Sequence, residues 1–140
     1  MKDTLVPGLE YRHVFAVPES KTVRNLYPES ERFQEFPEVF ATGFMVGLME
    51  WACIELMAPH LDDGEGSLGI HIDVSHEAAT PPGMTVTVDA RLISIEKRKL
   101  TFAIEAHDGQ DLIGRGGHQR AIILLDRFNA KVAEKAAKNG

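Results

Sequence analysis

A carboxylate in an apolar run is the first residue of this sequence that could do chemistry. Glu50 interrupts the stretch EVFATGFMVGLMEWACIEL, residues 38–56, with Val46 and Gly47 one turn before it and Cys53 one turn after. Desolvating a carboxylate among apolar side chains is costly unless a partner stabilises it. Glu50 is therefore either a structural carboxylate paired with an arginine or a catalytic group.

An imidazole extends the alternation of the segment that begins at Ser67. The apolar residues on one side of this segment are Leu68, Ile70, Ile72 and Val74. His76 continues on the same side, toward the expected core. A histidine and a carboxylate in one dry cavity can act as general acid and base, or as nucleophile and base. The alternative is a structural histidine whose ring nitrogens are hydrogen-bonded within the core. A second ionisable group in the same core, Glu50, counts against this alternative.

A hydroxyl stands at the start of the apolar run. Thr42 is a candidate cap for the first helical turn. The free N–H groups of that turn also form an anion site, suited to the oxyanion of an attacked carbonyl. Eight residues separate Thr42 from Glu50, about 12 Å of helix rise, so a substrate or a long side chain must connect them. Gly43 and Gly47 suggest that a ligand or another strand approaches the helix there.

Three further residues are candidates for contact with a substrate. Arg120, in GGHQRAII, shares a strand phase with Ile122 and is either the salt partner of Glu50 or a group that anchors a ligand. Phe33 and Phe36 lie in ERFQEFPE, which is polar enough to be a lid. Their spacing also suits core packing.

One long helix and an antiparallel sheet must position these side chains. The sequence predicts strands over residues 10–17, from Ser67, over 84–95, over 100–107 and over 112–125, a buried helix over 42–56 and a surface helix over 126–138. Short connections make the last four strands an antiparallel meander. The class is α+β in a single domain over residues 1–140. The stretch AIILL is apolar on both faces, which predicts a homodimer.

Composition limits the partners. The 15 Lys and Arg against 21 Asp and Glu give a net charge of −6, which argues against nucleic acid or an anionic membrane. An anionic ligand would need a local basic patch, and the KRK at residues 97–99 could help hold phosphates. The single cysteine, Cys53, and the lack of a signal peptide or spanning segment predict a cytoplasmic protein. No spacing of ligands predicts a metal, and no glycine fingerprint predicts a nucleotide cofactor.

Longer stretches together resemble the fluoroacetyl-CoA thioesterase family, within the hot-dog-fold thioesterases. These stretches are TVRNLYPES, EFPEVFATGFMVGLMEWAC, GEGSLG, HEAATPPGMTVTV and FNAKV. The resemblance implies a hot-dog fold, in which an antiparallel β-sheet wraps a long central helix, and a dimer with its active site near the subunit interface. It also implies that Thr42, Glu50 and His76 are the catalytic residues.

The same resemblance assigns the remaining site residues and a reaction. Gly69 matches the glycine associated with the substrate carbonyl, Arg120 matches a substrate-contacting arginine, and Phe33 and Phe36 match lid phenylalanines. The expected activity is hydrolysis of fluoroacetyl-CoA to fluoroacetate and CoA, a detoxification that needs no cofactor and no metal. The alternatives are a thioesterase for another short-chain acyl-CoA, a hydratase-like relative and a non-catalytic acyl-CoA-binding domain.

Overall fold

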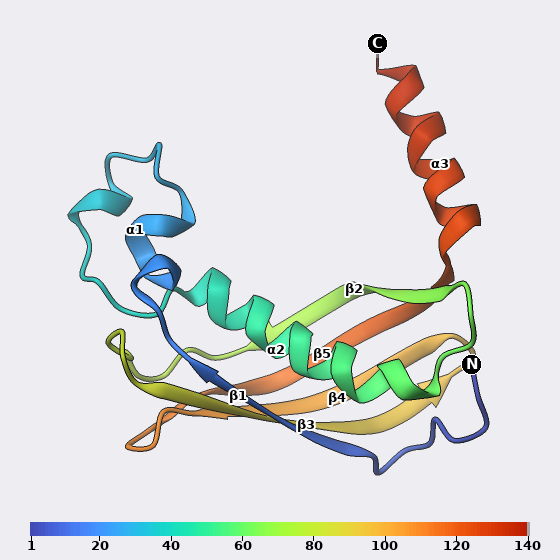
Figure 1. Ribbon diagram of the computed structural model, residues 1–140, viewed down its shortest axis with the longest axis horizontal. Helices are drawn as coiled ribbons and strands as arrows, with labels where there is room; N and C mark the ends of the chain where they lie inside the picture. Colours follow the sequence, from blue (N-terminus) through green and yellow to red (C-terminus); the bar gives the residue numbers. More distant parts are fainter. Residues whose placement is uncertain (140) are drawn as a thin grey trace.

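The computed structural model describes residues 1–139, in which a long helix lies across one face of a five-stranded antiparallel sheet (Figure 1). The strands are β1 (Glu10–Ala16), β2 (Glu65–Val74), β3 (Thr85–Glu96), β4 (Lys99–His107) and β5 (Leu112–Leu124). The helices are α1 (Val23–Leu26), α2 (Thr42–Met57) and α3 (Leu125–Lys138), with single 3-10 turns at Glu19–Lys21, Phe33–Glu35 and Ala58–His60. This confirms the predicted α+β class and the predicted long helix.

The strand order differs from the predicted four-strand meander. The sheet has the order β1-β3-β4-β5-β2, so only β3, β4 and β5 form a meander, and β2 pairs with β5 at one edge. The segment over residues 75–84 is too long for a tight hairpin and contains Pro81 and Pro82. Its Thr80 carbonyl accepts a hydrogen bond from the Phe40 amide at 2.8 Å, so it crosses toward the start of α2 instead of returning beside β2.

One side of α2 packs on the sheet and the other is open in the single chain. The buried residues of α2 are Met45, Leu48, Met49, Ala52, Cys53, Leu56 and Met57. On the opposite side, Gly43, Gly47, Trp51 and Ile54 are exposed. The prediction of a helix buried on all sides is therefore wrong for one chain. An exposed apolar side on a central helix is typical of a surface that another element covers.

A β-bulge in β2 changes which of its residues face the core. The register shifts between Gly69 and His71, so Leu68 pairs with Ala121 and Ile72 pairs with His118, on opposite faces of β5. The strict alternation predicted from Ser67 onward is thus wrong, because the extra residue at position 70 reverses the phase. Leu68, Ile70 and Ile72 are 40%, 51% and 40% exposed, so β2 is an apolar edge strand.

The last helix projects from the body. α3 leaves the end of β5 and points away from the sheet (Figure 1), and none of its described residues is buried. This confirms the predicted surface helix to within one residue at its start. Within residues 1–139, no helix is both long enough and apolar enough to cross a membrane.

Candidate active site

A buried guanidinium lies at the centre of the candidate site. Arg120 of β5 is 4% exposed, and its Nη1 donates to Oε1 of Glu50, from α2, at 3.2 Å. Its Nε donates to Oγ of Ser67, from β2, at 2.9 Å, and its Nη2 donates to the Ser67 carbonyl at 3.1 Å. The structure thus shows Arg120 as the ion-pair partner of Glu50. Its direct contact with a substrate stays a prediction.

His118 completes this cluster and was missed by the sequence analysis. Its Nδ1 lies 2.7 Å from the carbonyl oxygen of His71, so Nδ1 carries the proton. The bare Nε2 then accepts from Nη1 of Arg120 at 3.1 Å. Burial lowers the pKa of His118 and outweighs the hydrogen bond to the His71 carbonyl, which raises it, while the neighbouring Arg120 charge lowers it further. A neutral His118 therefore orients the guanidinium that holds Glu50.

The signal for His118 is present in the strand pattern. His118 stands two residues before Arg120, and Ile122 stands two after it, so all three share the buried face of β5. The ring of His118 stacks on Phe102 with centroids 6.4 Å apart. Extending the phase of Arg120 backwards along the strand would have placed this imidazole beside the ion pair.

Gly69 lies directly against the Glu50 carboxylate. A Cβ at position 69 would come within 2.6 Å of Oε1 of Glu50 and 3.0 Å of Cε1 of His118. Only glycine lets the strand backbone and the carboxylate lie side by side here. On the helix, Gly43 faces Leu26 of α1, whereas a Cβ on Gly47 would meet nothing within 4 Å in this chain. The space beside Glu50 and Gly47 is therefore open.

Thr42 and His76 form a second pair at the start of α2. The two side chains meet at 2.7 Å between Oγ1 of Thr42 and Nδ1 of His76. The N-cap of α2 is Ala41, and no side chain caps the helix, so the predicted capping by Thr42 is wrong. The Thr42 hydroxyl is bound to His76 instead. The amides of Thr42 and Gly43 begin the helix, where N–H groups lack an intrahelical acceptor.

His76 faces Thr42 and not Glu50, which corrects the expected pairing of imidazole and carboxylate. No hydrogen bond or ion pair between His76 and Glu50 is found within residues 1–139. Burial lowers the pKa of His76. Its Nε2 is buried and has no hydrogen-bond partner in the described chain. A neutral imidazole with an unused ring nitrogen is thus present near the helix start.

Two glycines of β5 hold the segment that carries His76. A Cβ on Gly114 would collide with the Ser75 carbonyl, and one on Gly116 would collide with the Asp73 carbonyl. The Ser75 amide donates to the Arg115 carbonyl at 2.9 Å, and the Glu77 amide donates to the Ile113 carbonyl at 2.6 Å. The close approach of the two backbones fixes His76 over the first turn of α2.

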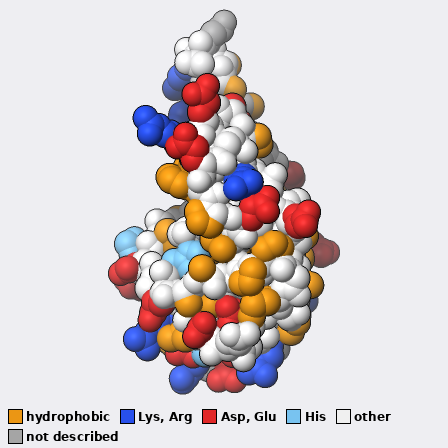
Figure 2. Space-filling model, turned by 90° about the vertical axis from the view of Figure 1, so that its left-hand side faces the viewer, with side chains coloured by type: hydrophobic (Ala, Val, Ile, Leu, Met, Phe, Trp, Pro, Cys, Tyr) orange, Lys and Arg blue, Asp and Glu red, His pale blue; other side chains and the backbone are white. Residues whose placement is uncertain are grey.

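An aromatic loop lies beside the same end of α2. The Phe33 ring is 5.8 Å from the ring of Tyr27 and 6.3 Å from that of Phe36, and Nε of Arg24 donates to the Phe36 carbonyl at 3.0 Å. Phe36 is 46% exposed, so core packing does not account for it. Figure 2 shows hydrophobic side chains gathered at the surface of this end of the molecule. The exposure of Phe36 is compatible with the predicted lid formed by Phe33 and Phe36.

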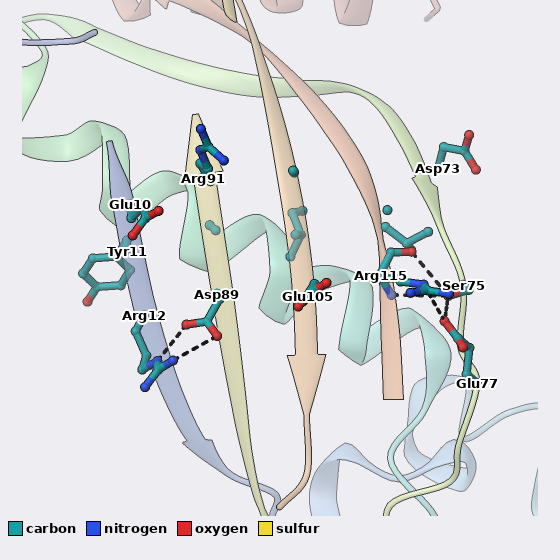
Figure 3. Close-up of a pocket in the computed structure, with 15 residues that line it drawn as sticks. Glu10, Tyr11, Arg12, Asp73, Ser75, Glu77, Asp89, Arg91, Glu105 and Arg115 are labelled. Carbon is teal, nitrogen blue, oxygen red and sulfur yellow. Dashed lines mark hydrogen bonds and ion pairs between the residues drawn. The ribbon is translucent and has the colours of Figure 1, made fainter. Parts of the chain in front are cut away.

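A wide hollow lies on the other face of the sheet. It measures about 1220 Å³, and charged side chains line it (Figure 3). Arg12 pairs with Asp89 at 2.7 Å, and Arg115 lies 3.5 Å from Glu77. None of the predicted site residues lines it, and half of its eight charged residues are paired with one another. It is not the site that contains Glu50.

Cys53 is the neighbour of Glu50 that could have been a nucleophile. Its side chain is buried, and desolvation raises the pKa of the thiol to about 12, with the Glu50 charge adding to the shift and Arg120 opposing it. The thiol therefore stays protonated at neutral pH, which supports the choice of Glu50 over Cys53.

Known proteins share this fold and sequence. The family model of fluoroacetyl-CoA-specific thioesterases matches residues 17–126. The chain belongs to this family. The fluoroacetyl-CoA thioesterase of Streptantibioticus cattleyicolor is 63% identical over 135 residues, which cover 96% of this chain and 97% of that protein.

Solved structures agree with this assignment. A structure of the fluoroacetyl-CoA thioesterase FlK has a TM-score of 0.93 at 62% identity, covering 95% of this chain and 98% of the other. A hot-dog-like protein from Thermanaerovibrio acidaminovorans, 23% identical, has a TM-score of 0.79 over 92% of this chain and 91% of its own, and supports the fold alone. As a member of the fluoroacetyl-CoA-specific thioesterase family, the chain has the hot-dog fold and is a thioester hydrolase, which confirms both expectations.

Replacing His118 tests its place in the cluster. His118→Phe removes the acceptor for Arg120 and the donor to the His71 carbonyl, and so leaves buried polar groups unpaired. We expect a loss of about 1–3 kcal/mol in the free energy of unfolding, measured in denaturant, together with a lower kcat for thioester hydrolysis. His107→Phe, at the half-buried end of β4, is the control and should change stability by less than about 0.5 kcal/mol. Equal stability of the two variants would contradict the role of His118.

Proposed function

We propose that Thr42, Glu50 and His76 perform the hydrolysis of fluoroacetyl-CoA to fluoroacetate and CoA. The observation that carries this proposal is the Glu50 carboxylate, which Arg120 holds against Gly69 beside the open space at Gly47. The relative at 63% identity is named for this substrate, and solved structures of such a relative contain fluoroacetate, acetyl-CoA or CoA. The physiological role is removal of a toxic acyl-CoA.

Glu50 supplies the attack on the thioester. Its carboxylate either adds to the carbonyl carbon or removes a proton from a water that adds. The negative charge that develops on the carbonyl oxygen is stabilised by the amide of Gly69, the residue that lies against Glu50. The C–S bond then breaks, and the thiolate takes up a proton to leave as CoA. Where water adds, fluoroacetate is released directly; where Glu50 adds, water hydrolyses the resulting anhydride, which releases fluoroacetate and restores the Glu50 carboxylate.

Thr42 and His76 move protons in this scheme. Thr42 orients the carbonyl or the attacking group, while the neutral His76 uses its unpartnered Nε2 to carry a proton to the leaving thiolate. The α-fluorine makes the α-C–H bond more acidic and the carbonyl more electrophilic, so a base beside the acyl group can also use the α-proton. Fluorine and hydrogen differ little in size. Selectivity for the fluorinated acyl group therefore arises in the transition state and not from pocket volume.

The remaining site residues close and shape the acyl pocket. Phe33 and Phe36 form a lid over the end of α2 that carries Thr42. Gly69 lies against the acyl carbonyl. Arg120 contacts the substrate when its Nη1 gives up the hydrogen bond to Glu50 or to His118 and donates to the substrate instead. No metal and no cofactor take part. The acyl-CoA is the ligand, and nucleic acid and membranes are not partners.

We propose a homodimer that covers the apolar edge of the sheet. The exposed apolar residues on β2 and on the open side of α2 are Trp51, Ile54, Leu68, Ile70 and Ile72. β2 is an edge strand, and an exposed apolar edge is suited to pairing with a second copy of the same chain. The single buried Cys53 fits a reducing compartment, so the proposed location is the cytoplasm.

Substitution of Glu50 tests the reaction. Glu50→Gln keeps the size of the side chain but removes the charge, so release of CoA from fluoroacetyl-CoA should fall by roughly a hundredfold or more. Fluoroacetyl-CoA and acetyl-CoA are compared side by side on the native and variant proteins with a thiol reagent. Equal native rates on the two substrates would remove the selectivity for fluorine. No release from either would leave a domain that binds acyl-CoA without turning it over.

The acid limb of the pH profile tests His76. Because the pKa of His76 is lowered from 6.5, the neutral form dominates at pH 7 and is lost only as the pH falls through the lowered value. We expect kcat to fall on acidification with a midpoint below 6.5, and His76→Ala to abolish most of the activity. A His76→Ala protein with full activity and an unchanged acid limb would contradict the assignment.

A charge on β2 tests the homodimer. Ile70→Lys places an ammonium group on the exposed apolar edge and should produce a monomer in sedimentation experiments, with reduced hydrolysis, because burying an unpaired charge is costly. Val14→Lys is the matched control, since Val14 is 60% exposed on β1, at the opposite edge of the sheet. The control should remain a dimer. A native protein that sediments as an active monomer would count against the proposed interface.

A further inference from the structure

A buried hydrogen bond joins the segment between β2 and β3 to the turn between β4 and β5, at one end of the sheet (Figure 1). Oγ1 of Thr80 donates to Oδ2 of Asp108 at 2.9 Å, and the two residues are 0% and 4% exposed. Resting on the proposed role of Thr42 and His76 in hydrolysis, we propose that Thr80 and Asp108 are positioning residues. They hold the Thr42–His76 pair in place at the start of α2.

Two short backbone segments carry the Thr42–His76 pair, and they are bonded to each other at both ends. At one end, Oγ1 of Thr42 lies 2.7 Å from Nδ1 of His76. At the other end, the Phe40 amide donates to the Thr80 carbonyl at 2.8 Å. Phe40 stands two residues before Thr42. Thr80 stands four residues after His76. Residues 40–42 and 76–80 therefore form a closed frame, and a shift at Thr80 is passed to the pair at the other end.

Asp108 fastens this frame to the sheet. It is the first residue after β4, and its Oδ1 accepts hydrogen bonds from the amides of Gln110 and Asp111 at 3.0 and 2.8 Å. Its own amide donates to the Asp111 carbonyl at 3.0 Å. These bonds fix the carboxylate within the turn. The other oxygen, Oδ2, then receives the Thr80 hydroxyl at a defined point.

The Asp108 carboxylate is charged although it is buried. Burial raises its pKa, but the hydrogen bonds from the amides of Asp111 and Gln110 and from the Thr80 hydroxyl outweigh burial, and the net shift of the pKa is downward. In the described part of the chain, residues 1–139, Asp108 has no ion-pair partner. A hydrogen bond to a charged acceptor is roughly twice as strong as one between neutral groups. Thr80 is therefore held more firmly than a neutral acceptor would hold it.

The imidazole of His76 depends on its backbone for its position. Its Nε2 has no hydrogen-bond partner in the described chain, so Thr42 is the one side chain that binds the ring there. The amides of Ser75 and Glu77 bond to β5 and fix the point where the segment leaves that strand. The bond between Thr80 and Asp108 fixes the segment four residues further on. The backbone that carries His76 is thus held on both sides.

Kinetics of Thr80 variants test this assignment. Thr80→Val replaces the hydroxyl by a methyl group of similar size, and Thr80→Ser keeps the hydroxyl. We expect kcat for fluoroacetyl-CoA to fall roughly tenfold to a hundredfold in Thr80→Val, with KM changed by less than about twofold, because a small misplacement slows the chemical step. Thr80→Ser should keep at least about half of the native kcat. Thr80→Ala carries the same expectation as Thr80→Val and replaces it if the valine variant does not fold.

A second set of variants tests the link to Asp108 and supplies the control. Asp108→Ala should lower kcat as Thr80→Val does, and Thr80→Val/Asp108→Ala should lower it no further than Asp108→Ala alone, because both remove one hydrogen bond. Fully multiplied losses would contradict the link. Thr101→Val is the matched control, since it removes a half-buried hydroxyl of β4 that accepts from Gln119. Its kcat should equal that of the native protein.

Magnetic resonance of the His76 ring separates this proposal from the proposed function. The ¹⁵N shift of Nδ1 reports the hydrogen bond to Thr42 whether or not any thioester is hydrolysed, and His76→Ala identifies the signal. Thr80→Val should move this signal, whereas Thr80→Ser and Thr101→Val should leave it at its native position. A native signal in Thr80→Val would overturn the proposal, as would an equal loss of kcat in Thr101→Val. A moved signal with native kcat would support the positioning and remove His76 from the proposed mechanism.

Discussion

The burial of one guanidinium constrains the rest of this structure. Arg120 is almost completely removed from water, and an uncompensated charge in such a place would cost several kcal/mol. Glu50, Ser67 and His118 together compensate it, and they come from a helix and two strands. The register of β2 against β5 and the rotation of α2 about its axis must therefore both be correct before Arg120 is satisfied. The carboxylate proposed to attack the thioester is oriented by the same contacts.

Irregular backbone makes these contacts geometrically possible. The bulge between Gly69 and His71 lets Ser67 bind Arg120 on one side of it, while the His71 carbonyl binds His118 on the other. The missing side chain at Gly69 leaves the Glu50 carboxylate room against the strand. These features weaken a regular ladder, which is the usual situation where a functional site is built into a sheet.

Sequence patterns predicted the elements well and the contacts between them less well. Apolar periodicity identified the long helix and most strand bounds, because burial forces a period on helices and strands alike. Strict alternation ignores the bulge that follows Gly69 in β2, although a glycine inside a strand is a signal for one. It therefore pointed His76 toward Glu50, whereas the structure pairs His76 with Thr42. Arg120 was recognised as a possible partner of Glu50. The phase of Arg120 along β5 places His118 on the same buried face, but the His71 carbonyl that fixes its tautomer belongs to the backbone, which a side-chain pattern does not describe.

Selectivity for the acyl group cannot come from the rest of the substrate. Fluoroacetyl-CoA and acetyl-CoA carry the same nucleotide and pantetheine arm, so contacts with those groups contribute equal affinity for the two substrates. Discrimination must then lie where the acyl group reacts, close to Glu50, Thr42 and His76. The ion pair with Arg120 holds Glu50 in one place, and the hydrogen bond to Thr42 holds His76 in another. Polar groups that are fixed before the substrate binds can respond to the charge distribution of the acyl group in the transition state, which an apolar wall cannot do.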